Sequence, residues 1–333
     1  MANARCIKNA ARRIVLLMVI CITYDQAISQ DTVQAGGPGS YRMLNGITDN
    51  IKIPFTMHHG KPLLQVEING HKGTLMVDNG VLWDQIWLFG SPLVETLKLK
   101  PIEEGSIGGA GEGDPTAAYT VENITLQFED IIFYEQPVWV SPPSAGFAKM
   151  FPGADGQLCN TFFKHFIVEF DFITNHVILH KPGKFKYKGK GSALDLQKNQ
   201  SGTYSIPFKF EMHNGIKYDE RVDIDFGGIY PLKIALNNRH SIQLPKDVNE
   251  TYSYGAQGKC TEYTGEIKSM IIGKYTFYKP VVVFGDEKTS RIHPDNLGVI
   301  GLPLFMKFNI IFDYINNKIY IDPNDNFDKP FEN

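Results

Sequence analysis

The sequence predicts a mostly β protein made of two similar lobes, each a six-to-eight-stranded, barrel-like unit, related by a pseudo-twofold axis. Three observations support this fold class. The chain has 333 residues, enough for about two domains, and is 43% hydrophobic. Its two halves carry the same motifs in the same order. Its apolar segments are short and separated by turn residues, and no sustained amphipathic helix interrupts them.

The internal repeat extends over most of the chain. Residues 156–180 align without a gap with residues 298–322 at an offset of 142, and residues 78–80 align with residues 225–227 at an offset of 147. The offset drifts only slightly between these segments, as small changes in loop length would produce. We therefore expect a duplicated domain whose two copies place equivalent residues at equivalent positions.

The N-terminus is typical of a secretory signal peptide. Four basic side chains precede the apolar run at residues 14–22, and residues 27–29 form a small-residue cleavage site. The apolar run is too short for a comfortable membrane span. We expect export to the periplasm or the extracellular space, and a mature chain that starts at Gln30 and has no membrane span.

The composition suggests six segments along the chain. They are a signal peptide at 1–29, a flexible lead-in at 30–50, a first lobe at 51–182, a Lys/Gly-rich linker at 183–203, a second lobe at 204–323 and a polar tail at 324–333. The short run of lysines and aromatics near the linker favours a solvated connection over a basic binding patch, because the rest of the chain is acidic.

Short apolar runs bounded by turn residues predict the strands in order. Leu63–Ile68 followed by Asn69-Gly70 predicts a hairpin, as does Ile206–Met212 followed by Asn214-Gly215. Further strands are expected at 74–77, 131–134, 138–140, 166–170 and 177–179, with counterparts in the second half, and short helices at 91–99 and around 161–165.

Charge and residue usage exclude several function classes. Residues 1–29 carry four basic side chains and one acidic, so their removal takes the formal charge from −3 to −6, which argues against a nucleic-acid partner. The adjacent His58 and His59 point in opposite directions in an extended chain, so we expect no metal site and no cofactor. The mature part keeps Cys159 and Cys260, either as a disulfide or as two buried thiols.

Each half delivers one aspartate at the end of an apolar run, followed by Xaa-Gly. These residues are Asp78-Asn79-Gly80 and Asp225-Phe226-Gly227. The glycine allows a sharp turn that points its N–H at the carboxylate. Two such carboxylates at hydrogen-bond distance cannot both ionise, so they share one proton, as in the aspartic proteases that exemplify this chemistry.

On these motifs the chain resembles the retropepsin-like and pepsin-like aspartic peptidases, in a single-chain, two-lobe form with a duplicated Asp-Xaa-Gly motif. A Gly-rich segment follows each aspartate by 30 residues, starting at Gly108 and at Gly255. The resemblance implies that these segments are flaps, that Asp78 and Asp225 are the catalytic dyad, and that polypeptide is the substrate. The implied flap residues are Gly108, Gly109, Gly111, Gly255 and Gly258.

Four positions depart from the family pattern. The family has Thr or Ser between the aspartate and the glycine, where a hydroxyl bonds across to the other lobe, whereas this chain has Asn79 and Phe226. Phe226 can neither donate nor accept, so we expect a one-sided lock. Cys159 stands where Gly301 stands in the second half. Asp223 adds a carboxylate near the dyad that would raise its pKa or compete for its place.

Two hypotheses follow. The first is an exported aspartic-type endopeptidase that hydrolyses peptide bonds through a water activated by the Asp78/Asp225 dyad. The alternative is a catalytically inactive homologue that binds extended peptides in the cleft between the lobes. Both predict a polypeptide partner, and the internal duplication predicts a monomer, because one chain supplies both aspartates.

Overall fold

A computed structural model describes residues 39–47, 49–81, 85–199, 202–236 and 239–331. The expected signal peptide and the first part of the expected lead-in lie outside the described residues. The described chain is mostly β, as the sequence predicts. Among the described residues, no helix is both long and apolar enough to cross a bilayer.

In the described part of the first half there are strands β1–β11 and two short helices. In order they are β1 (Tyr41–Met43), β2 (Asn50–His58), β3 (Lys61–Ile68), β4 (His71–Val77), β5 (Ile86–Leu88), α1 (Pro92–Leu97), β6 (Pro101–Ile107), β7 (Thr116–Phe128), β8 (Ile131–Val140), a 3₁₀ turn (Pro143–Ala145), α2 (Phe147–Met150), β9 (Gly156–Leu158), β10 (Ile167–Asp171) and β11 (His176–His180). The helix expected at 91–99 is α1, whereas 161–165 forms only hydrogen-bonded turns.

The residues described in the second half form strands β12–β24 and one short helix. They are β12 (Ser192–Asp195), β13 (Gln197–Lys198), β14 (Tyr204–Glu211), β15 (Lys217–Ile224), β16 (Lys233–Leu236), β17 (Asn249–Gly255), β18 (Gly258–Glu266), β19 (Ser269–Ile272), β20 (Tyr275–Tyr278), β21 (Val281–Asp286), β22 (Gly298–Ile300), α3 (Leu302–Phe305), β23 (Phe308–Asp313) and β24 (Lys318–Pro323).

The same strand pairings occur in both halves. β4 runs parallel to β9 and β15 runs parallel to β22, and these are the strands that lead to the two aspartates. Similarly, β5 pairs parallel with β8 and antiparallel with β9, while β16 pairs parallel with β21 and antiparallel with β22. The pseudo-twofold relation between the lobes stays a prediction.

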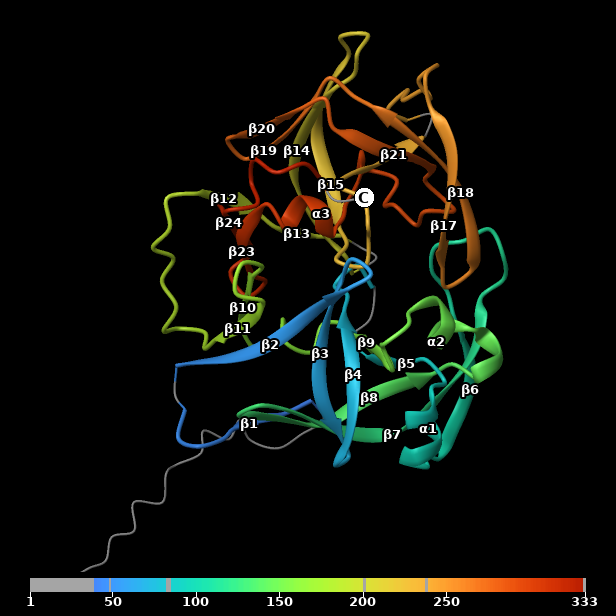
Figure 1. Cartoon of the computed structure of the whole chain (residues 1–333), viewed down its shortest axis with the longest axis vertical. Coiled ribbons are helices and arrows are strands. Elements are labelled where there is room, and N and C mark those ends of the chain that lie inside the picture. Colours follow the sequence, from blue (N-terminus) through green and yellow to red (C-terminus); the bar gives the residue numbers. More distant parts are fainter. Residues whose placement is uncertain (1–38, 48, 82–84, 200–201, 237–238, 332–333) are drawn as a thin grey trace, which may run out of the picture.

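The two halves share a sheet, which the sequence did not lead us to expect. β10 pairs with both β11 and β23, so the order β12-β24-β23-β10-β11-β2 carries C-terminal strands into the first half's sheet. The described strands therefore form a 14-stranded and a 10-stranded sheet, and the larger one contains strands from both halves. Figure 1 shows β10, β11, β23 and β24 between the lower and upper parts of the molecule.

Aromatic side chains fill the core beneath this shared sheet. The ring of Phe226 is fully buried and lies 4.7 Å from Phe170, 5.4 Å from Phe305 and 5.3 Å from Phe312, measured between ring centroids. Phe170 comes from the first half and the other three from the second. Because each large ring buries its apolar surface against rings of the other half, this cluster stabilises the junction.

Three segments are more ordered than their polar composition predicts. In the lead-in, β1 pairs with β8 and buries Tyr41 and Met43. In the linker, β12 pairs with β24 and β13 with β14. In the tail, Phe327 packs against Phe277 and Phe308. In each case a mostly polar segment is held against the folded chain, either by a few apolar side chains or by pairing with the edge of a sheet.

Candidate active site

Asp78 directly follows the last residue of β4, and Asp225 directly follows the last residue of β15. The Asp78 N–H donates to the Leu158 carbonyl of β9 at 3.0 Å, and the Asp225 N–H donates to the Ile300 carbonyl of β22 at 2.9 Å. Because β9 and β22 are buried and run parallel to the strands that carry the aspartates, these bonds fix both aspartate backbones.

The glycine two residues after each aspartate is required by the other half of the chain. The Gly80 N–H donates to Asp78 Oδ1 at 2.9 Å, and the Gly227 N–H donates to Asp225 Oδ1 at 2.6 Å. A Cβ atom on Gly80 would clash with the Asp225 carboxylate, and one on Gly227 would clash with the Asp78 carboxylate. The two motifs thus meet at one place, with each carboxylate against the other's turn.

The carboxylates of Asp78 and Asp225 are close enough to share a hydrogen bond, which needs a proton on one of them. Burial raises the pKa of Asp78 to about 7, aided by the negative charge of Asp225. The positive charge of Lys61 and the Gly80 N–H act in the opposite direction.

Between the two Asp-Xaa-Gly motifs, only the first half contributes a polar side chain to the hydrogen bond that joins them. Asn79 Oδ1 accepts a hydrogen bond from the Phe226 backbone N–H at 3.0 Å, and Asn79 Nδ2 donates to the Tyr314 hydroxyl at 3.1 Å. The Phe226 side chain makes no polar contact in return and packs in the aromatic core. Asn79 therefore replaces the family's hydroxyl on one side, while apolar packing replaces it on the other.

Two further side chains, which the sequence did not single out as dyad partners, hydrogen-bond the aspartates. Gln157 Nε2 donates to Asp78 Oδ2 at 2.7 Å, and the Tyr230 hydroxyl donates to Asp225 Oδ2 at 3.2 Å. Gln157 lies on β9, which runs parallel to the strand that leads to Asp78. Tyr230 gave no signal, because nothing in the local sequence shows that its hydroxyl turns back towards Asp225.

Two buried lysines lie beside the dyad. Lys233 is 4% exposed, pairs with Glu262 at 2.5 Å, and lies 4.4 Å from the centre of the Tyr230 ring. Lys61 is 8% exposed and interacts electrostatically with both aspartates. Burial lowers the pKa of Lys61, while the two carboxylates raise it. The charge of Lys61 therefore favours the ionised form of Asp78, whereas the charge of Lys233 is compensated by Glu262.

The two predicted flap segments form hairpin tips that contact each other. The tip between β6 and β7 meets the tip between β17 and β18 at the right of Figure 1. Gln257 joins them: its N–H donates to the Ala110 carbonyl at 2.8 Å, its Nε2 donates to the Gly113 carbonyl at 2.7 Å, and its Oε1 accepts from the Gly109 N–H at 3.1 Å.

The flap glycines permit this close contact. A Cβ atom on Gly109 would lie 2.8 Å from Ala256 Cβ, and one on Gly111 or Gly255 would clash with backbone of the facing tip. Gly258 has a φ of +88°, which a tight turn requires. Arg291 adds a hydrogen bond from its Nε to the Gly109 carbonyl at 3.0 Å.

Asp223 does not join the dyad. Its carboxylate accepts hydrogen bonds from Asn296 Nδ2 at 2.8 Å, from the His293 N–H at 3.0 Å and from Asn199 Nδ2 at 3.1 Å. Burial raises the pKa of Asp223, and these donors lower it. The expectation that Asp223 perturbs the dyad is wrong, because its neighbouring loops occupy both oxygens.

Cys159 and Cys260 are both buried thiols and do not bridge each other. The sequence left open a disulfide or two buried thiols, and the structure has two buried thiols.

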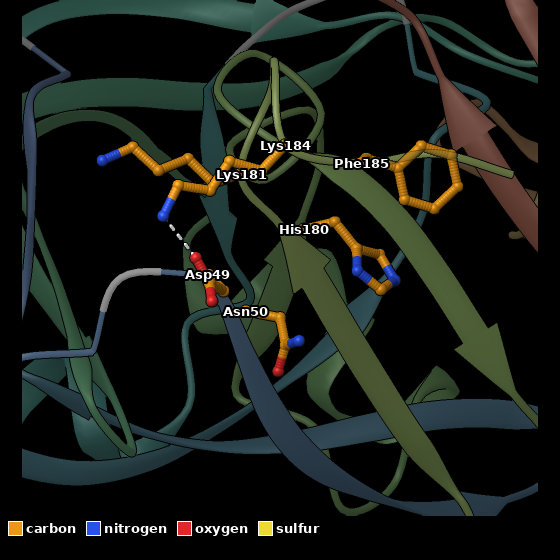
Figure 2. Close-up of a pocket in the computed structure, with 6 residues that line it drawn as sticks. All are labelled: Asp49, Asn50, His180, Lys181, Lys184 and Phe185. Atoms are coloured by element: carbon orange, nitrogen blue, oxygen red, sulfur yellow. Dashed lines mark hydrogen bonds and ion pairs between the residues drawn. The ribbon is translucent and has the colours of Figure 1, made fainter.

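A surface pocket of about 400 Å³ lies away from the aspartates, where the first half meets the linker. Figure 2 shows its lining residues, with Lys184 Nζ bonded to Asp49 Oδ1 at 2.5 Å. Nearby, His180 Nε2 lies 2.7 Å from Glu169 Oε2. None of the residues that line this pocket belongs to either Asp-Xaa-Gly motif.

Comparison with known proteins finds similarity at the level of the fold. No protein-family model and no curated protein matches the sequence. Among solved structures, the chain is similar to the aspartic proteinase from Irpex lacteus, with a TM-score of 0.53 and 13% sequence identity, over 85% of this chain and 100% of that one. The chain has the aspartic proteinase fold. At this identity the similarity establishes the architecture and leaves activity to the site itself.

Proposed function

We propose that the protein is an exported, monomeric aspartic-type endopeptidase that hydrolyses extended polypeptide at the Asp78/Asp225 dyad. The observation that carries the proposal is the reciprocal fit of the two Asp-Xaa-Gly turns, in which each glycine makes room for the other half's carboxylate. The pseudo-twofold lobes of the family and the N-terminal export signal of the sequence support the same function.

The proposed reaction uses the single proton shared by the dyad. The ionised carboxylate removes a proton from a water molecule, whose oxygen attacks the peptide carbonyl carbon, while the protonated carboxyl donates to the carbonyl oxygen. The resulting tetrahedral diol returns a proton through the dyad to the peptide nitrogen. The C–N bond then breaks to give an acid and an amine. Buried hydrogen-bond donors at Gly80 and Gly227 keep the carboxylates aligned during these transfers.

The competing function is a catalytically inactive homologue that binds peptide in the same cleft. It is favoured by Phe226, which cannot complete the lock between the halves, and by Cys159 in place of the glycine found at position 301. A peptide-binding cleft needs the fold and the flaps but not a shared proton, so the two functions differ in turnover alone.

Digestion of a denatured protein substrate distinguishes the two. We expect the mature chain to cleave it in the range of about pH 4 to 7, where the dyad holds one proton, and to be blocked by a statine-type inhibitor. Asp78→Asn, which keeps the shape of the side chain, should lose at least about 1,000-fold in rate. Peptide binding without cleavage at any pH by the wild-type chain would favour the inactive homologue.

A further inference from the structure

Each aspartate accepts a hydrogen bond from a side chain, and the two donors come from different places. Gln157 on β9 donates to Asp78 Oδ2 at 2.7 Å. The residue with the same register in the second half is Val299 on β22, whose side chain has no polar atom. Asp225 Oδ2 accepts instead from the hydroxyl of Tyr230, on the loop between β15 and β16, at 3.2 Å. The position of this ring therefore decides whether the second aspartate keeps its donor.

A buried ion pair and a glycine hold the Tyr230 ring. The Lys233 ammonium lies 4.4 Å from the ring centre and 2.5 Å from Glu262 Oε1. Lys233 is 4% exposed and Glu262 is 3% exposed. A Cβ atom on Gly228 would lie 2.6 Å from Tyr230 Cζ, so backbone lies against the hydroxyl end of the ring. Because a cation is attracted to an aromatic face, the ion pair and this backbone together fix where the hydroxyl lies.

The fold does not require charges at these two positions. In the first half, the residue of β5 with the register of Lys233 is Trp87. The residue of β7 with the register of Glu262 is Ala118. Both are buried, so the first half has apolar side chains where the second half buries an ion pair. Replacing a buried ion pair by apolar groups is often neutral or stabilising, so stability alone is a poor explanation for the pair.

We propose that the Lys233–Glu262 pair is a positioning device, which keeps the Tyr230 hydroxyl in place as the donor of the second aspartate. This donor stabilises the ionised form of Asp225, so the shared proton leaves the dyad at a lower pH. Because the pair carries no net charge, its main route to the aspartates is the tyrosine. The effect on catalysis rests on the proposed function, whereas the effect on the shared proton does not.

The test measures the titration of the dyad directly, by carbon-13 NMR of the mature chain labelled at the aspartate carboxyl groups. Asp78→Asn and Asp225→Asn assign the signals. Lys233→Met/Glu262→Met replaces the pair by uncharged side chains of similar length, and should move the upper midpoint of the dyad to higher pH by about 0.5 to 1 unit. In a Tyr230→Phe background the same double change should cause no further movement, because the hydroxyl through which the pair acts is absent.

Two controls accompany the double variant. Lys233→Arg keeps a cation beside the ring and should keep the wild-type midpoint. Lys209→Gln/Asp219→Asn removes an exposed ion pair between β14 and β15 and should also leave the midpoint unchanged. If circular dichroism shows that the double methionine variant is unfolded, Lys233→Gln/Glu262→Gln replaces it, since the two amides can hydrogen-bond each other without charge.

Digestion of a denatured protein is measured separately with the same variants. The double methionine variant should be about 5- to 10-fold slower than the wild type, with the upper limb of its pH–rate profile displaced in the same direction as the NMR midpoint. A wild type that cleaves nothing, with a midpoint that still moves in the variant, would overturn the peptidase proposal and support the positioning role. A midpoint that stays in place in the variant, or moves equally with and without the tyrosine hydroxyl, would overturn the positioning role.

Discussion

Asp78 and Asp225 are held by different kinds of donor. An amide nitrogen of Gln157, which can only donate, bonds Asp78 Oδ2, whereas the Tyr230 hydroxyl, which can donate or accept, bonds Asp225 Oδ2. The Tyr230 ring is in turn held under the Lys233 ammonium, which Glu262 fixes. At the scale of single residues, the two halves are therefore chemically unequal although their backbones follow the same pairings.

Tyr230→Phe tests the hydroxyl without removing the ring. A hydroxyl that donates to Asp225 stabilises the ionised carboxylate, so its loss should leave the shared proton in place to a higher pH. We expect kcat to fall about 5- to 10-fold with little change in KM. The upper limb of the pH–rate profile should move to higher pH.

The control for this variant is Tyr218→Phe, on β15 but stacked against Phe210 away from the dyad. It should leave both kcat and the pH profile unchanged. A Tyr230→Phe enzyme that is slower but has an unshifted pH profile would mean that the hydroxyl serves packing alone.

At the scale of secondary-structure elements, the hairpin tip between β6 and β7 is hydrogen-bonded to the tip between β17 and β18. Gln257 is 8% exposed and joins β17–β18 to β6–β7 through both its backbone and its amide side chain. In the proposed peptidase these tips act as flaps, which would have to separate before an extended polypeptide binds. The hydrogen bonds between the tips would then set how often they open, in the same way that local opening governs amide exchange.

Gln257→Ala removes the side-chain bonds of the tips and keeps the backbone ones. Each lost bond is worth about 1 kcal/mol, so amide hydrogen exchange at residues 108–113 should accelerate about 5- to 30-fold. Exchange in the core strand β15 should not change. Glu250→Ala, an exposed change on β17, should leave exchange at the tips as in the wild type. Tips that exchange equally in both variants would mean that the backbone bonds alone hold them.

At the scale of the whole molecule, the shared sheet joins the two halves and stabilises the folded state. The two buried aspartates lower the stability of the folded state. β23 and β24 close the edge of β10, so the second half completes the first half's sheet. The Asn79–Phe226 bond and the aromatic cluster tie the same junction. Against these, two buried carboxylates repel each other unless a proton lies between them.

The stability of the molecule should therefore depend on pH through the dyad. The pKa of Asp78 is about 7 in the folded chain, raised above the value of 3.8 for an unperturbed side chain. Between about pH 4 and pH 7 the folded state binds the extra proton, so the free energy of unfolding should fall as the pH rises, by roughly 3 kcal/mol.

The matched variant for this pH dependence is Asp78→Asn, which removes the second charge. Its unfolding free energy, measured in denaturant, should be nearly independent of pH over that range. At neutral pH it should also exceed that of the wild type. A wild-type curve parallel to that of the variant would show that both carboxylates ionise freely in the folded chain.

The sequence by itself determined the β architecture, the duplication, and the position of both aspartates at strand ends. These features follow from local patterns, since an apolar run with a following Xaa-Gly specifies a buried strand and a sharp turn wherever it occurs. The resemblance to the aspartic peptidases added the glycines of the hairpin tips and the one-sided lock at Asn79 and Phe226.

Only the tertiary structure decided what surrounds the aspartates and how the halves join. Gln157 reaches Asp78 across 79 residues of sequence, and Asn79 reaches Phe226 across 147. Lys61 is buried because the turn before it packs against a loop of the other half. Asp223 takes no part in the dyad because His293 and Asn296 donate hydrogen bonds to its carboxylate. Contacts of this range depend on the packing of distant strands, which no local pattern of residues encodes.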